Sequence, residues 1–205
     1  DLAFQARIFD PETPNHIFEW LLEETFDAKG NHIRYEYAQE RDQLTVALQR
    51  ASEKNRSYSS QRYIRRILYG NVPIGDDSTS QALSAAAVPQ RNGSHYLFEL
   101  LFDYADLPEE PEAAYIARAE GTEAEEFISD ENLRADPFSI YRPGFEIRTL
   151  RRCRRVLMVH HFPELAESGK AATTLVKSTV HLPPGSQYTN LAAASGDRQR
   201  LSLGT

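Results

Sequence analysis

The chain contains only one cysteine, one methionine and one tryptophan among its 205 residues. A single cysteine excludes a disulfide framework within the chain and a zinc site built from four cysteines. No stretch reaches the roughly 18 consecutive apolar residues that a membrane-spanning helix needs. No signal-peptide pattern is visible at the start, where the first residue is Asp1 rather than methionine. We therefore expect the sequence to be an excerpt of a longer polypeptide.

The chain also lacks an excess of basic residues, because 30 acidic side chains outnumber 23 lysines and arginines and give a formal net charge of −7. Nucleic-acid affinity comes mostly from neutralising phosphates with Lys and Arg, so no nucleic acid is expected as a partner. What the chain does have is a globular composition, with 40% hydrophobic residues, ten Tyr and ten Phe. This content predicts one packed core.

The clearest local pattern lies in residues 16–38, where apolar and polar residues alternate with a period of two. Such alternation predicts half-buried strands. Between the two alternating runs, residues 27–31 read Asp-Ala-Lys-Gly-Asn, a polar loop whose Gly30 can adopt positive φ. We therefore predict a β-hairpin here. The apolar positions of the first run are Phe18, Trp20, Leu22 and Phe26, and those of the second are Ile33, Tyr35 and Tyr37.

Two further strands are predicted at 62–70, ending at Gly70, and at 95–106. In the second of these, one face collects Tyr96, Phe98, Leu100, Phe102 and Tyr104, and the other collects His95, Leu97, Glu99, Leu101 and Asp103. Aromatic residues on one strand face usually pack in a core or against neighbouring strands, and we interpret this face so.

The remaining segments carry weaker patterns. Residues 75–94 are small and polar and residues 107–137 are acidic and proline-containing, so both are expected to be long surface loops or short helices. Residues 40–61 are the best place for a helix, on the loose spacing of Leu44, Val46, Leu48 and Ala51. We expect one β-rich unit over residues 1–182 and a poorly ordered or incomplete tail over 183–205.

Residues 142–162 place six arginines, Cys153 and the pair His160-His161 in one run. Its periodicity fits a helix or strands, and the β-branched and aromatic flanks favour two strands in sequence. In an acidic chain, we expect the arginines to pair with Glu and Asp on neighbouring strands or an adjoining domain. The six are Arg142, Arg148, Arg151, Arg152, Arg154 and Arg155.

Catalytic, cofactor and metal sites are not predicted. Nothing near Cys153 forms a cysteine-nucleophile signature. Adjacent residues on a strand point to opposite faces and no third ligand is placed by spacing, so we expect His160 and His161 to be a packed or solvent-bridged pair rather than metal ligands. Neither a glycine-rich phosphate loop nor a Gly-x-Ser-x-Gly elbow occurs, and the acidic run lacks EF-hand spacing.

One enzymatic alternative stays open at this point, an ADP-ribosyltransferase fragment. Such enzymes use a Ser-Thr-Ser strand and a Glu-x-Glu motif, and the chain contains Ser78-Thr79-Ser80 and Glu123-Ala124-Glu125 in that order. The first triplet lies in a loop-like run without apolar alternation, and the second lies in a glutamate-rich segment. A generic β-sheet protein-binding module is a further alternative.

Several blocks of the chain resemble a known family. The segments "ARIFDPETPNHIFEWLLEETFDAKGNHIRYEYAQE", "RYIRRILYGN", "FELLFDYAD", "RADPFSIYRPGFEIRTLRRCRRVLMVHHFPEL" and "TLVKST" are similar, in the same order, to the B component of insecticidal toxin complexes. That family shares its N-terminal region with the Salmonella plasmid virulence B protein and is often labelled SpvB/TcdB. The resemblance covers roughly residues 6–45, 60–72, 94–106 and 134–180.

The resemblance implies a mainly β, antiparallel fold, a curved sheet segment of an Rhs-like shell with long loops and a few short helices. It implies a non-catalytic part of a secreted toxin, made in the cytoplasm, whose β-sheet cocoon encloses and helps deliver a toxic effector. The implied partners are the rest of the B component, the C component as shell partner and cargo, and indirectly the A component pore. No cofactor, nucleic acid or direct membrane insertion is implied.

Overall fold

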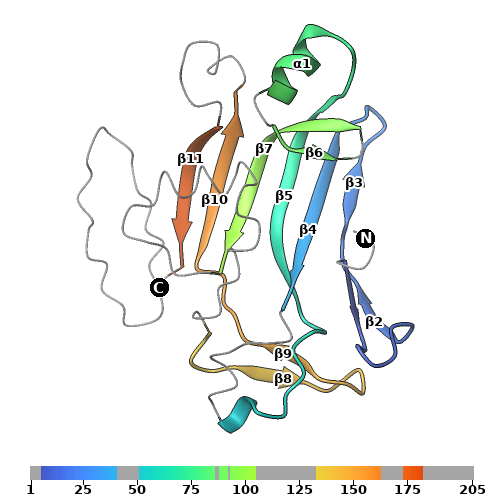
Figure 1. Cartoon of the computed structure of the whole chain (residues 1–205), viewed down its shortest axis with the longest axis vertical. Helices are drawn as coiled ribbons and strands as arrows, with labels where there is room; N and C mark the ends of the chain where they lie inside the picture. Colours follow the sequence, from blue (N-terminus) through green and yellow to red (C-terminus); the bar gives the residue numbers. More distant parts are fainter. Residues whose placement is uncertain are drawn as a thin grey trace, which may run out of the picture.

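The computed structural model describes residues 6–40, 51–85, 88–91, 93–104, 133–162 and 173–181. Its centre is a seven-stranded antiparallel sheet in the order β11-β10-β7-β5-β4-β3, with the short β6 paired to one end of β7 (Figure 1). The strands are β3 (Glu24–Phe26), β4 (His32–Gln39), β5 (Arg62–Pro73), β6 (Gln90–Arg91), β7 (Ser94–Asp103), β10 (Arg155–His161) and β11 (Thr173–Val180). The expected mainly β, antiparallel fold is confirmed.

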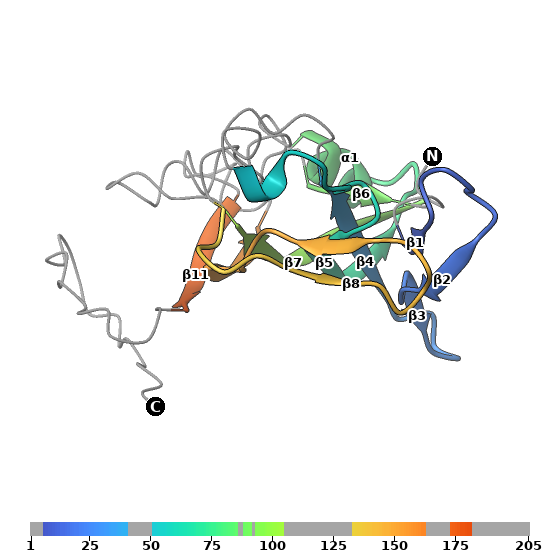
Figure 2. The same ribbon diagram turned by 90° about the horizontal axis from the view of Figure 1, so that it is seen from below.

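Within the described residues, two small hairpins and two short helices accompany this sheet. The strands β1 (Arg7–Phe9) and β2 (Ile17–Trp20) pair with each other, and so do β8 (Phe138–Ile140) and β9 (Ile147–Thr149). The helix α1 spans Ser78–Ala85, and a single 3-10 turn spans Ala51–Glu53. Figure 2 shows both helical elements on the same side of the sheet.

The predicted loop between β3 and β4 is confirmed, and its local chemistry explains it. The Asp27 carboxylate accepts hydrogen bonds from the backbone N–H groups of Lys29 (2.8 Å) and Asn31 (3.0 Å), and Gly30 takes a φ of +86°. The Asn31 side-chain amide donates to the same carboxylate, and with these backbone bonds it holds the pKa of Asp27 below its ordinary value. The side chain of Asp27 therefore builds the turn itself.

The two sides of the sheet differ in accessibility. Residues paired across antiparallel strands share a face, so the register assigns each side chain to one of two sets. The packed face is buried and carries Arg34, Glu36, Arg66, Leu68, Glu99, Leu101, Leu157, Val159, His161 and Leu175. The open face is half-buried and carries Tyr35, Tyr37, Ile67, Tyr69, Phe98, Leu100, Met158 and His160.

A glycine within β5 allows an aromatic residue to pack closely on the open face. Gly70 has a φ of +69°, and a Cβ there would collide with the ring of Phe98. That ring lies 5.2 Å from the ring of Tyr69 and 4.7 Å from that of His160, measured between centroids. The aromatic row therefore crosses three strands because Gly70 has no side chain to obstruct it.

Several sequence predictions need correction. The predicted continuous strand in 16–26 is divided into β2 and β3, and β2 is largely exposed rather than half-buried. The strand from 62 does not end at Gly70 but continues to Pro73. In and just after β7, residues of both predicted faces are buried, with His95, Glu99, Leu101 and Asp103 on one face and Tyr96 and Tyr104 on the other. Phe98 packs against Tyr69 and His160 of the neighbouring strands, so the predicted packing of the aromatic face is confirmed for these residues.

The predicted helix over 40–61 is wrong in its described part, where only Ala51–Glu53 is helical, and residues 41–50 lie outside the described residues. The loop expected at 75–94 contains α1, in agreement with the expected short helices. Most of 107–137 and the tail 183–205 lie outside the described residues. The two strands expected within 142–162 are confirmed as β9 and β10, whereas β11 was not predicted.

Candidate functional site: a buried polar network at the end of the sheet

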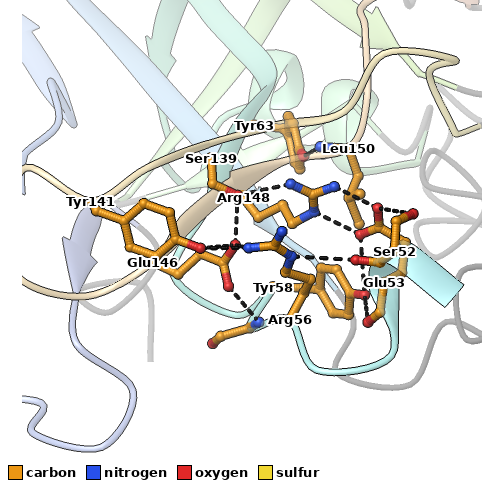
Figure 3. A network of polar contacts seen from close by, with 11 residues as sticks. Ser52, Glu53, Arg56, Tyr58, Tyr63, Ser139, Tyr141, Glu146, Arg148 and Leu150 are labelled. Atoms are coloured by element: carbon orange, nitrogen blue, oxygen red, sulfur yellow. Dashed lines mark hydrogen bonds and ion pairs between the residues drawn. The ribbon is translucent and has the colours of Figure 1, made fainter.

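An extensive polar network joins the 51–58 segment to the β8–β9 hairpin (Figure 3). At its centre, Arg148 of β9 donates two hydrogen bonds to the Glu53 carboxylate, with Nε–Oε2 at 2.6 Å and Nη2–Oε1 at 2.5 Å. Both side chains are almost completely buried. This bidentate hydrogen bonding lowers the pKa of Glu53 and raises that of Arg148, so the pair stays charged.

Tyr58 closes the network on the Glu53 side. Its hydroxyl donates to the backbone carbonyl of Glu53 at 2.6 Å, and burial together with the neighbouring Glu53 carboxylate raises the pKa of Tyr58 to about 12. The phenol therefore stays protonated at neutral pH and acts as a donor.

Glu146 closes the network on the hairpin side. Its carboxylate accepts hydrogen bonds from the Ser139 hydroxyl (2.5 Å), the Tyr141 hydroxyl (2.9 Å) and the Ser57 backbone N–H (3.1 Å), and it pairs with Arg56 (3.2 Å). Burial alone would raise the pKa of Glu146, but these donors and the Arg56 charge lower it. Several donors thus keep both carboxylates of the network ionised. This arrangement fits a structural role in joining two segments better than a role in proton transfer.

A second buried pair lies beside this network. Arg151 donates to Glu40 with Nε–Oε2 at 2.7 Å and Nη2–Oε1 at 2.8 Å, and both side chains are fully buried. The neighbouring Leu150 backbone N–H donates to the Tyr63 hydroxyl of β5 at 3.0 Å. The segment after β9 is therefore fixed to β4 and β5 by charge and by backbone contact.

The packed face of the sheet carries a third group of charges. Glu99 of β7 lies between Arg66 of β5, with which it forms an ion pair, and His161 of β10, whose Nε2 is 3.2 Å from Glu99 Oε2. On its other side, His161 Nδ1 lies 3.2 Å from the Thr173 hydroxyl of β11. These contacts connect four adjacent strands across one buried face.

The predicted pairing of the arginines is confirmed for Arg148 and Arg151, although their partners are not on neighbouring strands. Glu53 lies in the 3-10 turn and Glu40 follows β4. Arg142 and Arg152 are exposed. The arginine-rich run therefore divides into side chains that build the interior and side chains that face solvent.

The histidine and cysteine predictions can also be placed. His160 lies half-buried on the open face and His161 is buried on the packed face, as strand geometry requires. Burial raises the pKa of Cys153 to about 11, and its Sγ donates to the Arg155 carbonyl at 3.1 Å. At neutral pH this side chain is a thiol, the unreactive form.

The residues of the enzymatic alternative are only partly described. Ser78-Thr79-Ser80 begins α1 and is not a strand. The Ser80 hydroxyl accepts from the Gly75 backbone N–H at 2.7 Å, and the Ser80 N–H donates to Asp77 Oδ1 at 2.7 Å. These contacts cap the helix. Glu123-Ala124-Glu125 lies outside the described residues.

Over the part of the chain that the structure describes, no group of three or more His, Cys, Asp or Glu side chains is arranged to hold a metal ion. In the same residues, no helix has the length and apolar character to cross a membrane.

The functional features that sequence reasoning missed are the acidic partners Glu40 and Glu53. They lie 111 and 95 residues from their arginines, so no local spacing could have identified them.

Comparison with known proteins identifies a family whose sequences are similar to this chain. The family model described as Salmonella virulence plasmid 65kDa B protein matches residues 3–162. Mono(ADP-ribosyl)transferase SpvB from Salmonella typhimurium is 34% identical over 190 residues, which is 92% of this chain and 29% of that protein. The chain therefore spans less than a third of the curated relatives it matches.

Solved structures show the same fold. The N-terminal domain of effector protein SpvB from Salmonella typhimurium matches with a TM-score of 0.57 and 32% identity, covering 87% of this chain and 56% of that one. The Photorhabdus luminescens Tc holotoxin pore matches with a TM-score of 0.60 and 28% identity, covering 87% of this chain and 8% of that one. The TcdB2-TccC3-Cdc42 structure matches with a TM-score of 0.56, 28% identity and coverage of 86% and 8%.

Proposed function

The chain belongs to the family of the Salmonella virulence plasmid 65kDa B protein, SpvB, and from this premise we propose that it is a non-catalytic wall segment of a Tc/SpvB-type toxin B component. In this role it forms part of a β-sheet cocoon that encloses a toxic effector and helps deliver it. The toxin is made in the cytoplasm and secreted, and this segment neither binds nucleic acid nor inserts into a membrane.

The observation that carries the proposal is the way the charged side chains are used. The carboxylates of Glu40 and Glu53 are each engaged by an arginine inside the fold, and Glu146 is engaged by several donors. A general acid or base needs a carboxyl or imidazole that is free to exchange a proton with substrate. These groups instead join the hairpin and the 51–58 segment to the sheet, as a wall that must keep its shape requires.

The partners of this wall are proposed from the same relatives. One solved match is a TcdB2-TccC3 complex and another is a Tc holotoxin pore. We infer that the rest of the B component and the C component contact this segment, and that the pore component is reached indirectly.

Proteolysis of an assembled toxin tests the wall role. The full B polypeptide that carries this chain would be produced with its C component and treated with protease, with protection of the effector as the readout. Arg151→Ala, which leaves Glu40 buried without its arginine, should open the wall and expose the effector to cleavage. Arg152→Ala changes an exposed neighbour of the same type and should leave protection intact. Equal protection in both variants would contradict the proposal.

An NAD assay tests the enzymatic alternative separately. The 205-residue chain and its Glu125→Gln variant would be incubated with labelled NAD and a cell lysate as acceptor. We expect no label transfer by either protein. Transfer by the unmodified chain that the substitution abolishes would establish the ADP-ribosyltransferase reading and remove the non-catalytic one.

A further inference from the structure

The border formed by β2 and β3 carries exposed apolar side chains, and neither strand has a described strand partner on its outer side. Among the described strands, β2 pairs only with β1 and β3 pairs only with β4, so each has one edge without a strand partner. The two strands follow each other closely in the chain, and Tyr37 of β4 donates to the Leu22 carbonyl between them at 2.8 Å. In Figure 1, β2 and β3 run along the same border of the molecule. Unpaired strand edges are templates for strand addition.

Large apolar residues concentrate on this edge. Phe18, Trp20, Leu22 and Phe26 fall within nine consecutive residues, and Trp20 and Phe26 are 70% and 80% exposed. Phe18 and Trp20 share one face of β2 because successive strand side chains alternate. Single exposed apolar residues are common on protein surfaces, but a run of four indicates a contact surface. We name these four residues the aromatic edge.

Two exposed carboxylates lie beside the aromatic edge. Residues 10–27 contain six carboxylates and neither lysine nor arginine. Four of these carboxylates are engaged within the fold, because Asp10 lies near His16, Glu23 and Glu24 pair with Arg34, and Asp27 builds its own turn. Glu12 and Glu19 are exposed, and Glu19 lies between Phe18 and Trp20 in the sequence. The guanidinium of Arg7, on the paired strand β1, lies 5.2 Å from the Trp20 ring centroid. This contact shows that the ring can accept a cation on its face.

We propose that the aromatic edge binds, by strand addition, an extended segment of another polypeptide that has apolar residues at every second position and Lys or Arg between them. The apolar side chains of that segment would pack on Phe18, Trp20 and Phe26, and its cations would face the exposed carboxylates of Glu12 and Glu19. A second copy of this chain fits less well, because its outer strand β11 carries a single basic residue, Lys177. The inference rests on the edge itself and does not depend on the proposed wall function.

Trp20 is the chain's only tryptophan, so its fluorescence reports directly on this surface. The probe is a synthetic peptide of alternating valine and lysine, titrated into the 205-residue chain, and its matched control alternates valine and glutamate. We expect the lysine peptide to shift Trp20 emission to the blue and to protect it from acrylamide quenching. Added salt should weaken this binding, because exposed charges are screened. The glutamate peptide should produce no shift.

Variants locate the contact. Phe26→Ser should weaken binding of the lysine peptide about tenfold, which corresponds to about 1.4 kcal/mol. Val176→Ser, at a 42% exposed position on the opposite edge strand β11, should leave binding unchanged. Glu19→Lys should weaken the lysine peptide and favour the glutamate peptide, and this exchange of preference does not depend on any loss of folding.

Three results would overturn the inference. Equal shifts with both peptides would remove the charge selectivity, and no shift with either would remove the binding site. A blue shift that depends only on protein concentration, together with a dimer in light scattering, would assign the edge to a second copy of this chain.

Discussion

The two faces of the central sheet reverse the usual distribution of polar and apolar side chains. The packed face buries Arg66, Glu99 and His161 among its aliphatic residues, whereas the half-buried open face carries Ile67, Leu100 and Met158 on the same three strands. Burying charge is costly unless each charge is paired, and exposing apolar residues forgoes their transfer free energy. The comparison shows that this sheet is held by specific pairs on one side and offers an apolar surface on the other.

Buried ion pairs of this kind specify an arrangement more than they stabilise it. Their desolvation penalty can exceed their mutual attraction, but removing one partner leaves an uncompensated buried charge. Arg148–Glu53 and Arg151–Glu40 each fix a segment distant in sequence to one position. A wall segment that must present a fixed surface requires this type of contact.

The largest effect is expected at the fully buried pair. Arg151→Ala should lower the free energy of unfolding by about 3–5 kcal/mol, because Glu40 then loses its bidentate partner inside the fold. Chemical denaturation of the 205-residue chain measures the loss.

The double variant Arg151→Met with Glu40→Leu provides the control for this experiment. It removes both charges, so most of the lost stability should return. A single variant that loses less than about 1 kcal/mol would show that the pair is not isolated from water as described.

Alanine substitutions at two adjacent leucines of β7 compare the stability contributed by the two faces of the sheet. Leu101 is fully buried on the packed face, so Leu101→Ala should cost about 2–5 kcal/mol. Leu100 is half-exposed on the open face, and Leu100→Ala should cost about 1 kcal/mol because less area is removed from contact. Denaturation midpoints of the two variants test this, and equal losses would mean that both faces are packed alike.

Alanine substitutions at two glycines with positive φ, one in the sheet and one in a loop, allow the cost of the new methyl group to be compared between the two places. Gly70→Ala should destabilise the chain by about 2 kcal/mol, since the new methyl group meets both an unfavourable φ and the ring of Phe98. Gly30→Ala shares the positive φ but meets no atom within 4 Å, so about 1 kcal/mol is expected. If Gly30→Ala proved the more damaging in thermal unfolding, the packing of Phe98 over β5 would be in error.

The smallest effect concerns pH. Glu146 has a folded pKa below its ordinary value of 4.5, so its contribution is complete above that value and is lost as pH falls through the folded pKa. The stability of the unmodified chain should therefore fall more steeply below pH 4.5 than that of Glu146→Gln. Chemical denaturation at several pH values between 3 and 6, a range of about three units around the carboxyl pKa, measures the free energy of unfolding of both proteins. If the two free energies fell in parallel over this range, the assigned contacts of Glu146 would be contradicted.

Alternation and turn chemistry made much of the fold predictable. Residues 32–37, the turn at Asp27 and Gly30, and the strands at 62–70 and 95–103 follow from local patterns. The burial of each face did not follow, because alternation separates two sets of side chains without saying which one is covered. The aromatic set of this strand was expected to pack, and Tyr96 and Tyr104 are buried, but Glu99 and Asp103 of the opposite set are buried as well.

Only the arginines of the candidate site could be predicted from the sequence, and their acidic partners could not. The arginine-rich run correctly predicted internal pairing, since six arginines in an acidic chain need partners. Glu40 and Glu53 could not be found, because they lie far from Arg151 and Arg148 in the sequence and only the sheet brings them together. The division of the first strand between β2 and β3 was missed because the alternation continues through Leu22 without interruption.

The central claim, that the charged face is closed and the apolar face is accessible, can be measured by thiol labelling. With Cys153 replaced by alanine, single cysteines at Leu157 and Met158 place a thiol on each face of β10. The account predicts rapid labelling of Met158→Cys and slow labelling of Leu157→Cys, at a rate set by opening of the fold. Faster labelling at position 157 than at position 158 would contradict it.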